Sequence, residues 1–167
     1  PNAACFDTDG NMYIADKSNN KIRKVSADGI VTTLAGSTEG FADGTGSAAM
    51  FYYPTGICIN SNGDLFIVES FNHRVRKITQ TGVVTTIAGS TAGNTDGIGS
   101  LAKFNFPEDI CIDSNDNLYV VDSANNLIRK ITPLGVVSTF AGSTMGYTDG
   151  TGTAAKFWFP SGICVDV

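Results

Sequence analysis

The chain has 167 residues, of which 42% are hydrophobic and 16% charged, with a formal net charge of -5. This composition is typical of a globular protein and excludes a disordered tail, and no apolar run reaches the roughly 18–20 residues of a membrane helix. The acidic balance argues against a nucleic-acid interface, and the single histidine excludes a three-histidine metal site within one chain.

The sequence repeats with a period of 53 residues, the spacing that separates its four cysteines, Cys5, Cys58, Cys111 and Cys164. The repeats align without an insertion and share an Ala-Gly-Ser triplet, an Asp-Gly-x-Gly motif and a Phe before a Pro. We therefore interpret residues 1–167 as one repeat region. It comprises units 1–53, 54–106 and 107–159 and a partial unit, 160–167.

Each unit predicts four short strands, as the second unit shows in chain order. Four runs rich in Val, Ile and Thr, or alternating in polarity, are separated by Asn/Asp/Gly turns, which is a strand and hairpin pattern. They are Gly56–Ile59, Leu65–Val68, Arg74–Ile78 and Val83–Ala88. A glycine-rich linker from Gly89 to Pro107 then leads to the next unit.

Four antiparallel strands in a repeat of roughly 40–50 residues predict the blade of a β-propeller. The first strand is the most apolar, as expected for the inner strand of a blade. The third carries alternating charges, with Arg74 and Arg76 expected near the outer rim. The fold class is therefore all-β.

Three segments resemble NHL repeats, a family named for an Asn-His-Leu triplet before the third strand. The second unit keeps the histidine in Asn72-His73-Arg74, and the Pro-x-Gly-Ile start of the inner strand also fits. The segments are 13–23, 66–76 and 119–129. The linker pattern is similar to long-repeat NHL arrays of secreted or surface bacterial proteins, which implies an extracellular or cell-surface location. The resemblance implies six blades and a binding module for protein or RNA, a sensor or, less often, a lyase.

Three blades cannot close a ring, because propellers close with about four to eight. The chain is then expected to be a segment of a longer propeller, or to pair with a second copy or a partner half into six blades. Residues Gly162–Asp166 predict one extra inner strand that duplicates the role of Ala3–Asp7. The starting Pro1 and this end inside a blade favour a segment of a longer array.

Two recurring polar features are expected to be structural. Asp16, Glu69 and Asp122 end the second strand of their units, and Arg23, Arg76 and Arg129 follow seven residues later. A catalytic residue would normally appear once, so we expect cross-strand ion pairs or loop ordering. His73 is expected to have a hydrogen-bonding role in a loop.

Structural interpretations are also favoured for two other features, the turns that follow the inner strands and the cysteines. Asp7 and Asp9 resemble the first half of a calcium loop but lack the bidentate Glu that follows the EF-hand glycine, so a tight Asx turn is favoured and calcium is a weak alternative. No other cofactor is expected. One cysteine per inner strand, without CxxC spacing, predicts buried free thiols.

Positions that vary while their neighbours repeat are candidates for binding. Phe41 and Tyr147 share one such linker position, and Tyr52 and Trp158 share another before the proline. Exposed aromatic rings suit contact with a protein or a carbohydrate, and the alternative is packing on the adjacent blade.

The sequence therefore favours a non-catalytic binding or scaffolding module that contacts a protein or glycan through its interblade loops. One alternative is part of a metal-dependent propeller lyase or lactonase, for which Glu108, Asp109 and His73 are the main singular polar residues. The other alternative is a purely structural repeat that assembles into rings or fibres.

Overall fold

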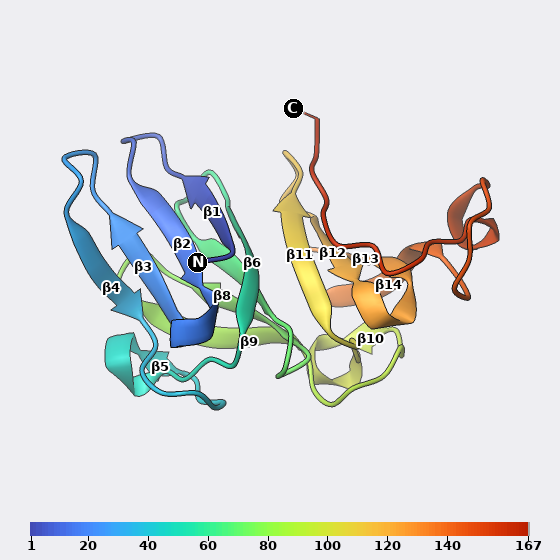
Figure 1. The fold of residues 1–167 in the computed structure, drawn as a ribbon, viewed down its shortest axis with the longest axis horizontal. Coiled ribbons are helices and arrows are strands. Elements are labelled where there is room, and N and C mark those ends of the chain that lie inside the picture. The colour runs from blue at the N-terminus through green and yellow to red at the C-terminus, as the bar shows by residue number, and fades with distance from the viewer. Residues whose placement is uncertain (167) are drawn as a thin grey trace.

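The computed structural model describes residues 1–166, which form three antiparallel sheets arranged as an open arc (Figure 1). The first sheet contains β1 (Ala3–Phe6), β2 (Met12–Asp16), β3 (Lys21–Val25) and β4 (Val31–Ala35). The second has the order β5 (Gly44–Thr45), β9 (Val83–Gly89), β8 (Arg74–Ile78), β7 (Leu65–Glu69) and β6 (Pro54–Ile59). The third has the order β10 (Gly97–Ile98), β14 (Val136–Gly142), β13 (Leu127–Ile131), β12 (Leu118–Asp122) and β11 (Pro107–Ile112).

Short 3-10 turns interrupt the loops between strands. They are η1 (Lys17–Asn19), η2 (Gly46–Ala48), η3 (Gly99–Leu101), η4 (Ser123–Asn125) and η5 (Gly152–Ala154). None of these helical turns within residues 1–166 is long and apolar enough to cross a membrane.

The expected four-stranded blades are present, and two of them gain a fifth strand from the preceding linker. Gly44 of β5 pairs with Val84 of β9, and Gly97 of β10 pairs with Val137 of β14. Each linker therefore runs along the outer edge of the next blade before it returns to that blade's inner strand. The first sheet has no such fifth strand.

The hydrophobic core lies between neighbouring blades. Ile22 of the first blade and Ile67 of the second are fully buried in one cluster, while Val75 and Val120 are fully buried in the cluster between the second and third blades. The inner strands β1, β6 and β11 contact one another in sequence along the arc. Because each blade needs a neighbour to cover its apolar face, stability is shared along the array.

The predicted extra inner strand is wrong: residues 160–166 form no strand. An inner strand is held by backbone hydrogen bonds to the second strand of its own blade, as β1 is to β2. Within residues 1–166 no second strand follows Gly162, so nothing offers that ladder. The segment runs beside β11 instead, where the Asp109 carboxylate accepts the Ile163 N–H at 3.1 Å.

The cysteines are free and only partly buried, which corrects the expectation of four buried thiols. Cys58 and Cys111 are buried, Cys5 is half-buried and Cys164 is exposed. Burial raises the pKa of Cys5 to about 12 and that of Cys111 to about 11. The two less protected thiols lie on the first inner strand and in the terminal segment, which have a neighbouring blade on one side at most.

Candidate functional site

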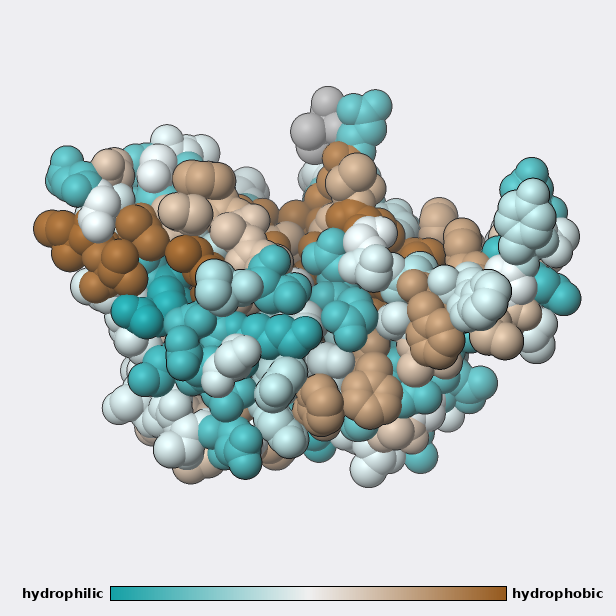
Figure 2. Space-filling model, in the orientation of Figure 1, coloured by the Kyte–Doolittle hydropathy of each residue, from teal (hydrophilic) through white to brown (hydrophobic). Residues whose placement is uncertain are grey.

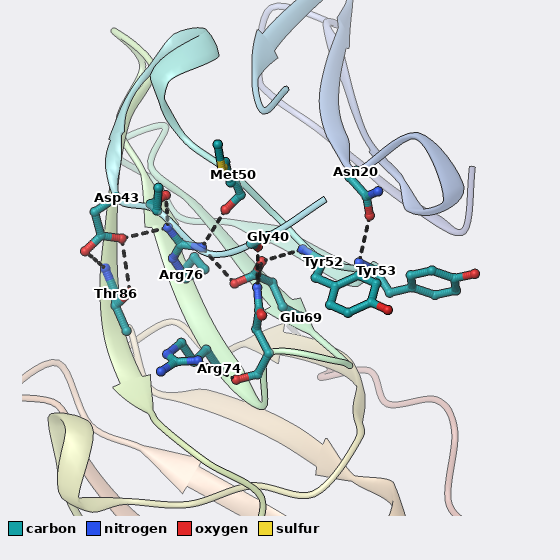
Figure 3. A network of polar contacts seen from close by, with 12 residues as sticks. Asn20, Gly40, Asp43, Met50, Tyr52, Tyr53, Glu69, Arg74, Arg76 and Thr86 are labelled. Carbon is teal, nitrogen blue, oxygen red and sulfur yellow. Dashed lines mark hydrogen bonds and ion pairs between the residues drawn. The ribbon is translucent and has the colours of Figure 1, made fainter. Parts of the chain in front are cut away.

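Arg76 is buried at the centre of the most extensive polar network of the second blade, which corrects the expected rim position (Figure 3). Its Nη1 donates to Glu69 Oε2 at 2.8 Å, a carboxylate that is also fully buried. Its Nη2 donates to Asp43 Oδ1 at 2.7 Å, and Asp43 belongs to the preceding linker. The arginine thus joins its own blade to the linker that covers it.

The linker backbone supplies two further acceptors for this guanidinium. Nη2 also donates to the Ala42 carbonyl at 2.8 Å, and Nη1 donates to the Met50 carbonyl at 3.2 Å. The ring of Phe51 lies 5.1 Å from the guanidinium carbon, a cation–π distance. Two carboxylates, two carbonyls and an aromatic ring face the buried charge, while its Nε–H is buried without a hydrogen-bond partner among the described residues.

The third blade repeats this network. Arg129 donates to Asp122 at 2.8 Å and to Asp96 of the preceding linker at 2.6 Å. It also donates to two linker carbonyls, and its guanidinium lies 5.2 Å from the Phe104 ring. The Asp of the Asp-Gly-x-Gly motif therefore has one role in both places, which is to hold the linker on the next blade.

The first blade lacks this shell. Arg23 and Asp16 approach to 3.5 Å, and the Arg23 side chain is 30% exposed. No linker within residues 1–166 lies over this arginine. Since the three arginines occupy the same position in the repeat, the difference comes from the missing linker.

Burial raises the pKa of Glu69, against the opposing effect of Arg76, and burial likewise raises the pKa of Asp122. Both carboxylates accept a backbone N–H as well: Tyr52 donates to Glu69 at 3.0 Å and Asn105 donates to Asp122 at 2.7 Å. All these contacts are internal to the protein, so Glu69 and Asp122 position the linkers that cover their blades.

A cluster of rings, here called the aromatic surface, lies where the linkers enter the inner strands. It consists of Tyr52, Tyr53, Phe71 and Phe106. Phe71 is central, with its ring centroid 5.0 Å from Tyr52, 4.7 Å from Tyr53 and 5.3 Å from Phe106. Phe71 and Phe106 are 43% and 39% exposed. Figure 2 shows hydrophobic side chains interrupting the hydrophilic lower half of the molecule.

Hydrogen bonds to the loop before the third strand fix the aromatic surface. Tyr53 donates its backbone N–H to Asn20 Oδ1 at 3.0 Å, and Phe106 donates its own to His73 Nδ1 at 3.2 Å. Burial, with a smaller contribution from Arg74, lowers the pKa of His73. The neutral ring keeps the lone pair that accepts this bond. The histidine therefore orients Phe106.

The structure places the four predicted binding aromatics in different surroundings. Tyr52 belongs to the aromatic surface, whereas Phe41 stacks on the next blade, 3.9 Å from the Arg74 guanidinium carbon. Tyr147 and Trp158 are 95% and 69% exposed on the last linker, which projects from the arc (Figure 1).

Sequence reasoning missed Phe71, although a signal for it exists. The equivalent positions of the other units hold small residues, Ser18 and Ala124. Phe71 is thus an aromatic residue at a position that varies while its neighbours repeat. The other candidates were selected by the same criterion.

Asp7 lies in a tight turn. Its Oδ1 accepts the N–H groups of Asp9 and Asn11 at 3.0 and 2.8 Å, and its Oδ2 accepts from the Asn11 amide and the Tyr13 hydroxyl. These donors give the carboxylate a role in the Asx turn. Among residues 1–166, no group of three His, Cys, Asp or Glu side chains has the geometry of a metal site.

The two singular acids of the enzyme alternative make structural contacts. Asp109 accepts the N–H groups of Ile110 and Ile163 at 2.9 and 3.1 Å. Glu108 lies 3.5 Å from the Ser70 hydroxyl. Both stand at the start of β11, next to the inner strand of the second blade.

We expect the Asp7 turn to make a pH-dependent contribution to stability. The side-chain hydrogen bond from Asn11 is the largest cause that lowers the pKa of Asp7 in the folded chain. Because the folded pKa lies below the unfolded value of about 3.9, the contribution is present above that pH and is lost as the pH falls through the folded value. We expect the stability difference between wild type and Asp7→Asn to be constant from about pH 7 to about pH 5 and to shrink towards pH 2.5.

Urea unfolding at each pH measures this difference. Asparagine is a matched replacement, because Asn60 forms the same turn in the second unit by accepting the N–H groups of Asn62 and Asp64. A difference that stays constant down to pH 2.5 would contradict the assigned role of the carboxylate.

The NHL repeat family matches this chain at residues 51–78 and 104–131. SUPPRESSOR OF QUENCHING 1, a chloroplastic protein of Arabidopsis thaliana, is 32% identical over 131 residues, which are 71% of this chain and 12% of that protein. NHL repeat-containing protein 2 of Gallus gallus is 35% identical over 105 residues, which are 61% of this chain and 14% of that protein. The chain thus spans a small part of the length of these relatives.

Solved structures share the fold. An auxiliary nutrient binding protein from Bacteroides thetaiotaomicron superposes with a TM-score of 0.73 at 22% identity, over 95% of this chain and 41% of that one. A streptogramin B lyase superposes with a TM-score of 0.61 at 22% identity, over 82% of this chain and 39% of that one. At these identities the likeness shows the fold alone.

Proposed function

The chain carries NHL repeats on an open segment of a β-propeller, and from this premise we propose that it is a non-catalytic binding module. Its aromatic surface contacts a protein partner through apolar side chains. The observation that carries the proposal is the ring cluster around Phe71, which is partly exposed where linkers and loops of two blades meet.

The energetics favour apolar contact over recognition of sugar hydroxyls. Aromatic residues that become buried at the centre of an interface dominate its binding energy. The polar groups beside the rings are already used inside the chain: Glu69, Asn20 and His73 each accept a backbone N–H of the aromatic surface. The rings themselves offer only the hydroxyls of Tyr52 and Tyr53 as polar groups, so we assign most of the binding energy to apolar contact with a protein partner.

Closure of the propeller into a full ring of blades and the cellular location are part of the same proposal. A partner half or a second copy completes the open arc, because the end blades expose apolar side chains such as Phe6 and Phe140. On the resemblance to secreted and surface NHL arrays, the module acts outside the cell or at its surface. A solved structure with the same fold is an auxiliary nutrient binding protein, and a binding role for this chain is in keeping with that fold.

Peptides selected from a phage-displayed random library on the wild-type chain test this proposal. We expect the Phe71→Ala/Phe106→Ala variant to bind most of them about 10-fold or more weakly, because losing a central aromatic contact costs more than about 1 kcal/mol. Leu134→Ala is the matched control, since Leu134 is an 85% exposed apolar residue in the turn between β13 and β14, with no assigned binding role.

Peptides that bind the wild type and the double variant equally would contradict the assigned surface. A glycan array run with the same three proteins tests the choice of partner. A glycan whose binding is lost in the double variant alone would overturn the choice of a protein.

A further inference from the structure

One hydrogen bond recurs at the end of every linker. The residue before the conserved proline donates its N–H to the side chain that ends the loop before the third strand, and Figure 3 shows this bond in the first unit. The bonded pairs are Tyr53 with Asn20 at 3.0 Å, Phe106 with His73 at 3.2 Å and Phe159 with Asn126 at 2.9 Å. Two acceptors are asparagine amides, and the third is the single histidine of the chain. Only the second unit therefore has an acceptor that titrates near neutral pH.

The backbone at this bond has a conformation that needs to be fixed. Phe106 has a φ of 48° and His73 a φ of 55°, both in the left-handed region, which costs free energy in a residue other than glycine. The neighbours of Phe106 are held without the histidine, because Asn105 donates to Asp122 at 2.7 Å and Pro107 begins β11. Loss of the bond to His73 therefore acts on Phe106 itself.

Protonation of the imidazole removes the acceptor. A neutral ring with its proton on Nε2 offers the Nδ1 lone pair, whereas an imidazolium carries a proton on both nitrogens. The proton added at Nδ1 then faces the Phe106 N–H, so two donors meet and the bond is lost. An asparagine amide has no such second state, because it does not titrate.

Phe106 connects the histidine to the aromatic surface. Its ring centroid lies 5.0 Å from that of His73 and 5.3 Å from that of Phe71, with the rings nearly perpendicular in both pairs. The N–H bond anchors the backbone that sets both ring contacts. Without it, Phe71 keeps only the rings of Tyr52 and Tyr53 in a fixed position.

The charges around this loop favour the neutral ring. Arg74, the next residue, adds to the effect of burial in lowering the pKa of His73, and Lys17 of the first blade brings another positive charge to the surface, 5.5 Å from the Tyr53 ring. No carboxylate of residues 1–166 forms an ion pair with His73. The acids of the neighbouring strands have other partners. They are Glu69 with Arg76, Asp122 with Arg129 and Glu108 with the Ser70 hydroxyl.

We infer that His73 is a pH switch of the aromatic surface: the neutral imidazole holds Phe106 in place, and the imidazolium releases it. The switch follows from the hydrogen bond, and only its consequence for binding rests on the proposed function. Since a partner needs the ordered rings, acidification weakens its binding.

The single histidine makes this switch directly measurable by NMR. We expect the imidazole Cε1–H signal to titrate with a pKa below the ordinary value of about 6.5, and the Phe106 amide proton to shift with the same midpoint as its bond is lost. The Tyr53 amide is the internal control, because it donates to Asn20 and should not follow this titration. A Phe106 amide that does not follow the histidine would overturn the inference.

His73→Asn is the matched variant, because asparagine is the acceptor in the other two units. The folded pKa of His73 lies below the unfolded value, so its contribution to stability is fully present above about pH 6.5 and is lost as the pH falls through the folded value. We therefore expect the urea midpoint of wild type to fall relative to that of His73→Asn between about pH 7.5 and about pH 5. Circular dichroism checks that the variant is folded. A constant difference between the two midpoints would contradict the switch.

Selected peptides that bind the aromatic surface and contain no histidine test the consequence for binding. One pH unit below the pKa measured for His73, about one tenth of the chains keep the neutral ring, so wild type should bind these peptides about 10-fold more weakly than at neutral pH. His73→Asn should bind them with the same affinity at both pH values. Equal affinity of wild type at both would overturn the control of binding by His73. If no peptide uses this surface, the proposed function fails, whereas the amide titration still decides the switch.

Discussion

We expect Arg76→Met to lower the free energy of unfolding by roughly 3–5 kcal/mol, the cost of leaving a buried charge without its partner. The substitution leaves Glu69 fully buried with no cation, and it removes the donor that binds Asp43 and the Met50 carbonyl. The linker then loses its strongest attachment to the second blade. Urea unfolding followed by circular dichroism measures the change.

The repeat supplies a matched control in Arg23→Met. Arg23 holds the same position in the first blade, but its side chain is 30% exposed and its ion pair is long, at 3.5 Å. A pair of this kind contributes about 0–1 kcal/mol, so the control should unfold nearly like wild type. Equal decreases in the free energy of unfolding of Arg76→Met and Arg23→Met would show that the linker contacts do not stabilise the second blade.

A second variant separates charge from packing. Arg76→Met combined with Glu69→Gln removes both buried charges and keeps an amide oxygen that can accept the Tyr52 N–H, and we expect the double variant to recover part of the stability that Arg76→Met loses. A double variant less stable than Arg76→Met would contradict the view that the unpaired carboxylate causes the loss.

We expect Phe104→Ala to lower the free energy of unfolding by roughly 3–5 kcal/mol, the usual cost of removing a fully buried phenylalanine. Phe104 has no exposed surface, and it packs in the core between the second and third blades. Its ring also faces the Arg129 guanidinium at 5.2 Å. The substitution therefore opens a cavity and removes one face of the arginine site.

Phe157→Ala is the control for this prediction, because Phe157 is the equivalent residue of the last linker and is only half-buried. In a monomeric sample we expect it to cost about 1 kcal/mol or less, since less apolar surface is lost from the core. A loss as large as that of Phe104→Ala in monomers would mean that Phe157 is already packed without a following blade.

The fold could be predicted from local patterns. Strands such as Leu65–Glu69 and Val83–Gly89 combine β-branched residues with Asn/Gly turns, and both signals act over a few residues. The period fixed the number of blades for the same reason, since every unit repeats the same signals. The terminal segment Gly162–Asp166 carries the same pattern but forms no strand, because a strand also needs a partner backbone.

The candidate site was only partly predictable. The pairing of Glu69 with Arg76 could be expected from their spacing. The burial of the Arg76 side chain could not be predicted, because Asp43 and Phe51 contact it from a linker that precedes the whole blade. Tyr52 was expected on a binding surface, whereas Phe71 joins that surface only because the fold places its ring between those of two linkers.

By itself, the sequence determined the repeat, its strands, its turns and the residue types at each recurring position, because these depend on local backbone preferences and on hydrophobic pattern. Only the tertiary structure decided which residues at the same repeat position have the same surroundings. Arg76 and Arg129 are buried and Arg23 is not, since a linker from the preceding unit covers the first two and none covers the third. Burial depends on neighbours, and a repeat at the end of an array has fewer of them.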